Sequence, residues 1–469
     1  MLALKDEPND ANKAKYKICR NKAQKIARQC ANEFYCNLSD SIQKASDTGN
    51  IRSMYEGIKK VIGKEIRKPA PLKSKSGELL NDKGQKLNRL VEHYSDLYSR
   101  ETTVSLKAIE EIPQMPVMSE LDSDPTISDL KKAIDALNCG KAPGQDSIPP
   151  DLIKACRDTL TQPLMDLLLQ CWREGQVPQD MRDAKVITLY KNKGERSDCN
   201  NYRGISLLSI VGKVFARVVL ARLQTLASTV YPEAQCGFRS ERSTIDMIFA
   251  TRQIQEKCVE QQMPLYIAFI DLTKAFDLVS RTGLFEILLR IGCPPTLLNL
   301  IISYHKDMEG VISFDGDESD PFPIKNGVKQ GCVLAPTLFG IFFSMLLRSA
   351  FKDSSEGVYL HTRSDGSMFN LARLRAKTKR REVLIRELLF ADDAALTSHS
   401  QEGLQTMLNN FSSACKEYGL TISIKKTQVM GLNIPAPPEL YIGNQLLEAV
   451  DIFPYLSQLL LPTRPLTQR

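Results

Sequence analysis

The chain has 469 residues, of which 42% are hydrophobic and 25% charged, a composition typical of a folded protein with two or three lobes rather than a disordered or fibrous chain. It contains no run of about 18 or more uncharged apolar residues, so we expect no membrane span and no membrane partner. The 12 cysteines and four histidines do not fall at the spacings of zinc ligands. Free thiols in a reducing, intracellular compartment, nucleus or cytoplasm, are therefore expected.

Basic residues are concentrated at the N-terminus. Residues 1–75 hold 17 Lys and Arg against 8 Asp and Glu, a net charge of +9 where the whole chain carries +7. We predict that residues 1–125 form a basic, largely helical arm and linker, with a loop over 66–85. Such an arm suits a polyanion such as nucleic acid or a solvated tail, and charge alone favours neither.

From residue 126 onward, helix and strand patterns alternate, which places the main domain over 126–456, with a short tail at 457–469. Ser128 is the expected cap of the first helix in this domain. The predicted strands cover 184–190 and 265–270. The predicted helices cover 129–138, 151–174, 205–227, 283–291, 337–351 and 402–418.

Two adjacent carboxylates stand between apolar residues in Phe390-Ala391-Asp392-Asp393. The pattern predicts a buried β-hairpin with its turn at the acidic pair. Carboxylates in apolar surroundings repel each other and are costly to desolvate unless a cation lies beside them, and Mg²⁺ prefers oxygen ligands. Asp-Asp is also ordinary turn chemistry, so both interpretations stay open for this segment alone.

A third carboxylate, Asp271, follows the predicted strand 265–270. An acid at the end of an apolar strand can face a ligand or cap a following helix. Together with Asp392 and Asp393 it offers three carboxylates that could hold two Mg²⁺ ions. Two such ions can activate an attacking 3′-hydroxyl and stabilise a leaving pyrophosphate.

Three further segments carry polar or basic residues on expected turns, at 201–206, 326–336 and 418–427. In the first, Arg203 on a glycine-containing turn suits a triphosphate. In the second, Gln330 can hydrogen-bond a base or sugar, and Gly331 allows close backbone approach. The third carries Lys425 and Lys426. Each segment taken alone is also compatible with an ordinary loop.

In this order the five segments resemble the reverse transcriptase domain of a non-LTR (LINE-type) retrotransposon, over residues 128–456. The resemblance implies an α+β fold, that of a right-hand polymerase with fingers and palm, and a small antiparallel palm sheet backed by helices. A thumb is expected to be truncated or absent, because only a short tail follows the segment 453–457 that resembles a primer grip. The implied activity is RNA-directed DNA polymerase, which adds dNTPs to a DNA primer on an RNA template.

The resemblance also implies catalytic roles. Asp271 and Asp392 would be the principal ligands of two Mg²⁺ ions, which Mn²⁺ could replace, with Asp393 as the supporting acid. Lys426, which matches the family's lysine better than Lys425, could protonate the departing pyrophosphate.

The nucleotide site is implied in the same way. Phe276 matches the aromatic residue that closes on the sugar C2′ and favours dNTPs over NTPs. Arg203 would contact the triphosphate, and Gln330 and Gly331 would line the template and nucleotide pocket. Ser423, Ala335 and Gly204 depart from the residues that are frequent in the family, and none of these positions is a metal ligand.

Two alternatives remain open at this stage. The chain could be a catalytically inactive, nucleic-acid-binding relic of such a polymerase, while an RNA-templated RNA polymerase is disfavoured by Phe276. The arginines and lysines over 373–381 could follow a nucleic-acid backbone or form the solvent face of a hairpin. The sequence leaves the oligomeric state open.

Overall fold

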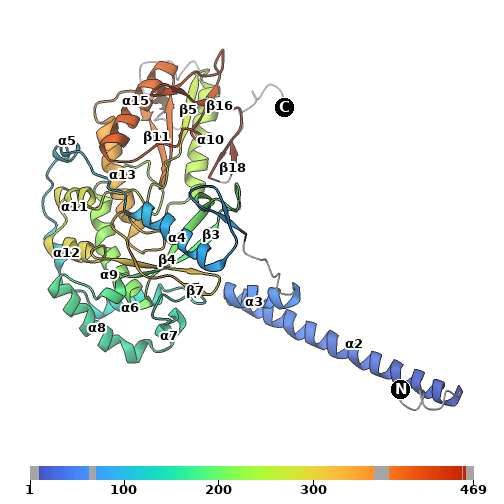
Figure 1. The fold of residues 1–469 in the computed structure, drawn as a ribbon. Helices are drawn as coiled ribbons and strands as arrows, with labels where there is room; N and C mark the ends of the chain where they lie inside the picture. Colours follow the sequence, from blue (N-terminus) through green and yellow to red (C-terminus); the bar gives the residue numbers. More distant parts are fainter. Residues whose placement is uncertain (1–9, 63–69, 364–379, 457, 461–469) are drawn as a thin grey trace.

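The computed structural model describes residues 10–62, 70–363, 380–456 and 458–460 (Figure 1). Helices α2 (Asp10–Asp47) and α3 (Ile51–Ile62) form an arm that extends away from a rounded body. The body contains two five-stranded sheets, each covered by helices, and its mixture of helices and small sheets agrees with the predicted α+β class. No helix in the described ranges is long and apolar enough to cross a bilayer.

The first sheet, which we call the acidic sheet, has the strand order β11-β12-β5-β13-β16. Its pairs are antiparallel except for β13 and β16, which run parallel at one edge. The predicted small antiparallel sheet is therefore present, with one parallel pair added. The strands are β5 (Leu265–Ile270), β11 (Glu387–Phe390), β12 (Asp393–Ser398), β13 (Gln428–Leu432) and β16 (Glu448–Ala449).

Strand β5 lies at the centre of the acidic sheet and is buried on both faces. Ile267 and Phe269 belong to one hydrophobic cluster, together with Met247 and Ile254 of α10 (Thr244–Glu260). The alternate residues Ala268 and Ile270 pack into the main core, to which α13 (Ala335–Phe351) and α15 (Gln401–Glu417) contribute. Cover on both faces explains why the strand is a continuous apolar run instead of an alternating one.

The second sheet has the order β4-β3-β6-β7, with β8 paired to β6. Helix α4 (Lys83–Tyr98) packs on this sheet through a cluster that joins Leu90 and Tyr94 to Val186 and Ile312. The strands are β3 (Ala184–Tyr190), β4 (Tyr202–Leu207), β6 (Glu309–Phe314), β7 (Asp317–Glu318) and β8 (Phe322–Pro323).

Strand β4 corrects two predictions. Arg203 lies within this strand, opposite Leu189 of β3, and not on a turn. The helix predicted over 205–227 begins later, as α9 (Ile210–Ser228), because the hydroxyl of Ser209 accepts a hydrogen bond from the Gly212 amide and caps it there. Pairing with β3 thus overrides the helical pattern at residues 205–207.

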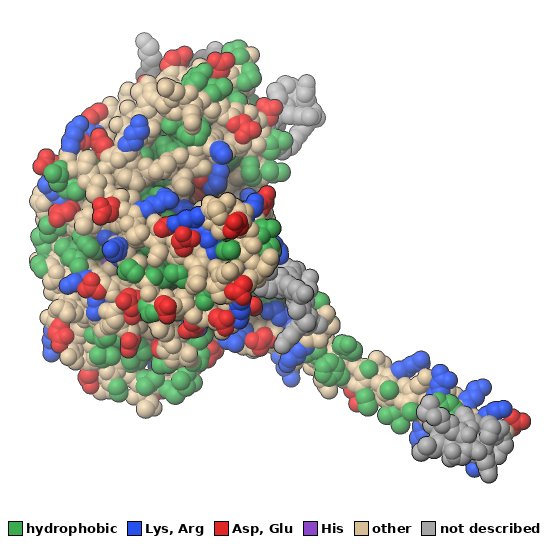
Figure 2. Space-filling view, in the orientation of Figure 1, with side chains coloured by type: hydrophobic (Ala, Val, Ile, Leu, Met, Phe, Trp, Pro, Cys, Tyr) green, Lys and Arg blue, Asp and Glu red, His purple; other side chains and the backbone are tan. Residues whose placement is uncertain are grey.

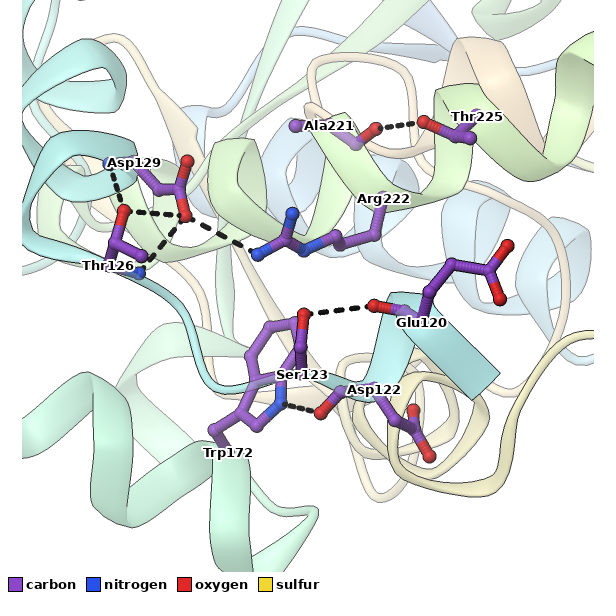
Figure 3. Close-up of polar contacts among 9 residues, drawn as sticks. All are labelled: Glu120, Asp122, Ser123, Thr126, Asp129, Trp172, Ala221, Arg222 and Thr225. Carbon is purple, nitrogen blue, oxygen red and sulfur yellow. Dashed lines mark hydrogen bonds and ion pairs between the residues drawn. The ribbon is translucent and has the colours of Figure 1, made fainter. Parts of the chain in front are cut away.

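Packing of the chain onto the body starts before residue 126. In Figure 3 the indole of Trp172 donates to the carbonyl of Asp122, in the short helix η1 (Ser119–Asp122). The Asp122 carboxylate in turn accepts from the amides of Thr296 and Leu297, at the start of α12 (Pro295–Ser303). These contacts do not test whether residues 126–456 fold independently, so the domain boundary at residue 126 stays a prediction.

The helix that follows, α6 (Ile127–Asp135), is capped by Thr126 and not by Ser128 as predicted. Thr126 and Asp129 form a reciprocal capping box, and Arg222 of α9 pairs with the Asp129 carboxylate at 3.3 Å (Figure 3). The helix begins earlier than predicted because Thr126 and Asp129 exchange hydrogen bonds at its start. A cap at Ser128 would leave the Thr126 hydroxyl and the Asp129 carboxylate without these partners.

The helices predicted over 283–291, 337–351 and 402–418 are present within two residues of their predicted bounds, and the helix predicted over 151–174 is divided at Cys156; α5, α10 and α12 were not predicted. The remaining elements are α5 (Leu106–Glu110), α7 (Pro150–Ala155), α8 (Arg157–Glu174), α11 (Arg281–Arg290), the short helices η2 (Gln179–Met181) and η3 (Cys199–Asn201), and the small strands β1 (Leu72–Lys73), β2 (Leu79–Leu80), β9 (Val358–Arg363), β10 (Arg380–Ile385), β14 (Tyr441–Ile442), β15 (Gln445–Leu446), β17 (Phe453–Tyr455) and β18 (Gln458–Leu460).

A buried arginine fixes the loop 326–331. The guanidinium of Arg281 donates to the carbonyls of Gly327 at 3.0 Å, His305 at 2.6 Å and Ile324 at 2.8 Å. Burial lowers the pKa of Arg281 to about 10, so the group stays charged at neutral pH. One side chain thereby holds carbonyls from three separate positions along the chain.

Arg281→Met should lower the free energy of unfolding by about 3–5 kcal/mol, because buried carbonyls lose a charged donor. Urea denaturation measures this change. The matched control is Arg157→Met, which removes an exposed ion pair with Asp135 and should leave the unfolding free energy nearly unchanged. Equal effects of the two substitutions would contradict the role given to Arg281.

Candidate active site

The pairing of β12 with β5 brings the three predicted carboxylates to one end of the acidic sheet. Ala394 is the partner of Ile270, so Asp393 and Asp271 occupy the next positions along the two strands. Phe390 pairs with Asp393 across the hairpin, which leaves Ala391 and Asp392 as its turn. The hairpin predicted from the sequence is therefore formed, but its turn lies one residue earlier than predicted, at Ala391 and Asp392, and Asp393 is the first residue of β12.

Burial, followed by the charges of neighbouring carboxylates, disfavours the ionised forms of Asp392 and Asp393. Burial raises the pKa of Asp392, and the charge of Asp271 raises it further. The protein around the carboxyl group of Asp393, together with Asp392 and Asp271, raises the pKa of Asp393 to about 6. Acids held in this way favour a cation beside them.

The cation present in the structure is Lys426. Its Nζ donates to Oδ2 of Asp271 at 2.8 Å, and its charge lowers the pKa values of Asp392 and Asp393. The turn that carries Lys426 is attached to the same strand end, because the Ser423 amide donates to the Asp271 carbonyl at 2.8 Å. The segment 418–427, which is far from residue 271 in the sequence, thus meets it in the fold.

The donor set fits a hard divalent cation in charge and atom type, since it offers carboxylate oxygens that repel one another. Over the described ranges, no three acidic, histidine or cysteine side chains form a preassembled metal cluster. The Lys426 ammonium forms an ion pair with the Asp271 carboxylate at 2.8 Å. A metal ion at this end of the sheet would therefore compete with Lys426 for Asp271.

A group of cations lies beside the acids. The charge of Arg203 lowers the pKa of Asp392, and the charges of Arg203 and Lys426 lower that of Lys191, on which burial acts most strongly. Burial also lowers the pKa of Lys274, followed by repulsion from Arg100 and Lys191. Cations that destabilise one another's charged forms gain from a bound anion.

Sequence reasoning missed Lys191 and Lys274 as members of this cationic group. Lys191 directly follows the correctly predicted strand β3, and its Nζ donates to the Asn200 carbonyl at 2.8 Å. Lys274 lies three residues after Asp271. The carboxyl group of Asp277, whose pKa burial raises to about 6, is adjacent to both lysines and to Arg203. Both lysines closely follow the end of a predicted strand, and this position in the sequence could have marked them as site residues.

Phe276 lies on the segment that follows Asp271. Its ring stacks on Phe339 with centroids 4.4 Å apart and meets the edge of Phe238 at 6.4 Å. Phe238 is 49% exposed, so an aromatic surface open to solvent adjoins the predicted gate residue. Sequence reasoning did not single out Phe238.

Gln330 and Gly331 lie between this segment and β4. The Ser206 amide of β4 donates to the Gln330 carbonyl at 2.9 Å, and the Val328 amide donates to the Phe276 carbonyl at 2.9 Å. Gly331 has φ +105°, and a Cβ there would lie 2.4 Å from the Ser206 carbonyl oxygen. A glycine is therefore required at this position.

The basic insertion predicted to follow a nucleic-acid backbone falls largely outside the described residues, which resume at 380. Lys425 is exposed beside Lys426. All eight predicted site residues lie in the described ranges. Direct contacts or strand register join Asp271, Asp392, Asp393 and Lys426, and Arg203 acts on Asp392 through its charge.

Comparison with known proteins identifies the family. A family model described as reverse transcriptase (RNA-dependent DNA polymerase) matches residues 190–456. The chain therefore belongs to this family.

Its curated relatives come from mobile elements. The chain is 28% identical over 329 residues to the RNA-directed DNA polymerase from mobile element jockey of Drosophila melanogaster, covering 68% of this chain and 33% of that protein. It is 27% identical over 385 residues to the Drosophila funebris counterpart, covering 80% and 39%. The predicted LINE-type reverse transcriptase domain is thus confirmed, and the chain spans only a third to two fifths of the length of these relatives.

Among solved structures, the chain is similar to apo telomerase from Candida tropicalis, truncated from its C-terminal domain. The TM-score is 0.40 at 13% sequence identity, and the match covers 64% of this chain and 60% of that one.

The raised pKa of Asp393 predicts a stability cost. Its value of about 6, against an ordinary 3.8, disfavours the ionised form in the fold, so the cost is present above pH 6 and is lost as the pH falls towards 4. Asp393→Asn should raise the unfolding free energy near pH 8 by about 1 kcal/mol, a figure reduced for the exposure of this side chain. Most of the gain should vanish near pH 4.

Denaturant titrations at the two pH values, without divalent metal, measure this effect. Asp315→Asn, in the exposed turn between β6 and β7, is the matched control and should show no such pH-dependent gain. A destabilised Asp393→Asn protein near pH 8 would contradict the prediction.

Proposed function

We propose that the chain is an RNA-directed DNA polymerase that transfers nucleotides from dNTPs to the 3′-hydroxyl of a DNA primer on an RNA template. The observation that carries the proposal is the meeting of Asp271, Asp392 and Asp393 at one end of the acidic sheet, beside a cluster of cations. In this proposal the acidic sheet and its helices are the palm, and the second sheet with α4 belongs to the fingers.

Asp271 and Asp392 are the principal residues to hold two Mg²⁺ ions, which Mn²⁺ can replace, and Asp393 supports them. The ions would lower the pKa of the primer hydroxyl and neutralise charge on the phosphates. Metal binding requires Asp271 to exchange its contact with Lys426. The freed ammonium is then a suitable acid for the departing pyrophosphate.

The remaining residues bind the nucleotide. Arg203 and the neighbouring Lys191 and Lys274 supply positive charge for the triphosphate, which would relieve their mutual repulsion. Gln330 and Gly331 line the pocket for nucleotide and template. Phe276, which is held against Phe339, excludes a ribose 2′-hydroxyl.

The helical arm is a further surface for nucleic acid. Figure 2 shows Lys and Arg side chains along α2, and the arm is exposed over most of its length. Lysines and arginines on such a helix can neutralise template phosphates outside the active site. A solvated arm without this contact is the alternative.

The first test is primer extension on an RNA template with dNTPs and Mg²⁺. Asp392→Asn should lower the extension rate by roughly 100-fold or more, because it removes charge that the metal ions require. Asp315→Asn is the matched control, since it removes a carboxylate away from the site, and should extend normally. Equal extension by the wild type and Asp392→Asn would refute the mechanism.

RNA binding, measured beside primer extension, distinguishes the inactive relic. Salt-sensitive RNA binding by the wild-type chain without any extension would favour a nucleic-acid-binding relic over an enzyme.

The second test concerns sugar selection. Phe276→Ala should raise the incorporation efficiency of ribonucleotides relative to deoxyribonucleotides by about tenfold or more, because the ring no longer clashes with the 2′-hydroxyl. Single-nucleotide incorporation with each sugar measures the ratio. Phe276→Tyr retains the ring and should retain the wild-type ratio. Unchanged rejection of ribonucleotides by Phe276→Ala would remove Phe276 as the gate.

A further inference from the structure

The acidic turn contains an unfavourable backbone conformation. Ala391, the first of its two turn residues, has φ +59°. This left-handed region is disfavoured for alanine, and such turn positions are usually filled by Gly, Asn or Asp. Contacts from elsewhere in the chain must therefore hold the turn.

One buried side chain makes these contacts. Gln235, which is 1% exposed, accepts a hydrogen bond from the Ala391 amide at 3.0 Å through Oε1 and donates through Nε2 to the Ala391 carbonyl at 3.3 Å. The same Oε1 accepts from the Gly237 amide at 2.8 Å. The side-chain amide thus binds both polar groups of the strained residue.

The backbone around Gln235 is fixed to the same hairpin. We call residues 234–239 the clamp segment. The Cys236 amide donates to the Leu389 carbonyl at 2.9 Å, and the Leu389 amide donates to the Ala234 carbonyl at 3.1 Å. These bonds add the clamp segment to the acidic sheet as a short parallel partner of β11.

The backbone of the clamp segment packs directly against the backbone of the acidic turn. A Cβ on Gly237 would lie 2.1 Å from the Ala391 amide nitrogen, so only glycine permits this approach. Arg239 restrains the segment from the other side, because its Nη1 donates to the carbonyls of Pro232 and Gln235, both at 3.1 Å.

We propose that Gln235 is a positioning residue, which holds Ala391 in its left-handed conformation and thereby fixes Asp392 and Asp393 relative to Asp271. It does not touch substrate. It acts through the backbone of the residue directly before Asp392. This role deepens the proposed function, because the acids it positions are those proposed to hold the metal ions.

The decisive variant is Gln235→Met in the full chain. Methionine has a similar length but can make none of the three hydrogen bonds. The chain offers a matched control in Gln405, whose Oε1 accepts from the Tyr441 amide and whose Nε2 donates to the Tyr441 carbonyl, both at 2.8 Å. Gln405→Met removes an equivalent pair of side-chain-to-backbone hydrogen bonds, but at β14, away from the acidic turn.

Three measurements follow. Hydrogen exchange of the peptide 387–396 should accelerate by about tenfold at the turn amide in Gln235→Met, and the same peptide should be unchanged in Gln405→Met. Mn²⁺ binding to the protein alone, measured by electron paramagnetic resonance, should weaken about 10-fold in Gln235→Met only. In primer extension kcat should fall by about tenfold while the KM for dNTP stays within roughly twofold.

The outcomes separate the two proposals. An unchanged exchange rate in Gln235→Met, or equal changes in both variants, overturns the positioning role. If Gln235→Met does not fold, the wild-type protein decides, because unprotected exchange of the Ala391 amide would show that the clamp hydrogen bond is absent. Wild-type protein that neither binds Mn²⁺ nor extends a primer would instead contradict the proposed function, while exchange at the turn still tests Gln235.

Discussion

The register between β5 and β12 is the constraint on which the rest of the site depends. It pairs Ile270 with Ala394, and the acids that follow and precede these residues must then lie at the same end of the sheet. A slip of one residue would turn the side chains of β12 to the opposite face. Because both faces of β5 are buried in separate hydrophobic clusters, such a slip would also place the apolar side chains of β12 in the wrong cluster, so the packing of the core protects the arrangement of the acids.

The site contains two neighbouring groups of like charge, one of carboxylates and one of cations. Asp271 raises the pKa values of Asp392 and Asp393, and Asp392 also raises that of Asp393, whereas Lys191, Arg203 and Lys274 form a separate group of cations. Among the residues that the structure describes, one close ion pair, between Lys426 and Asp271, joins the acids to a cation. Mutual repulsion of this kind reduces the stability of the fold and raises the affinity for metal ions and phosphates of the opposite charge.

Local patterns predicted the parts of this structure that depend on nearby residues. The strand 184–190, the strand 265–270 and the acidic hairpin were correct, because apolar runs and turn residues determine them. Arg203 was assigned to a turn because its strand conformation depends on pairing with β3. The roles of Asp271, Asp392 and Asp393 came from resemblance to a family, since spacing alone could not distinguish ligands from turn residues. Gln235 carried no sequence signal, as its partner lies 156 positions away.

The central place of β5 has a consequence for how the protein is made. Strand β5 emerges from the ribosome before both of its partners, which lie between residues 393 and 432. The segment Leu265–Ile270 therefore has no strand partner until those residues are synthesised. It contains no charged residue and is rich in β-forming side chains. Such a segment is prone to associate with copies of itself on neighbouring nascent chains. The pairing that places the acids at one end of the sheet therefore leaves this apolar segment open to association until the chain has been synthesised through residue 432.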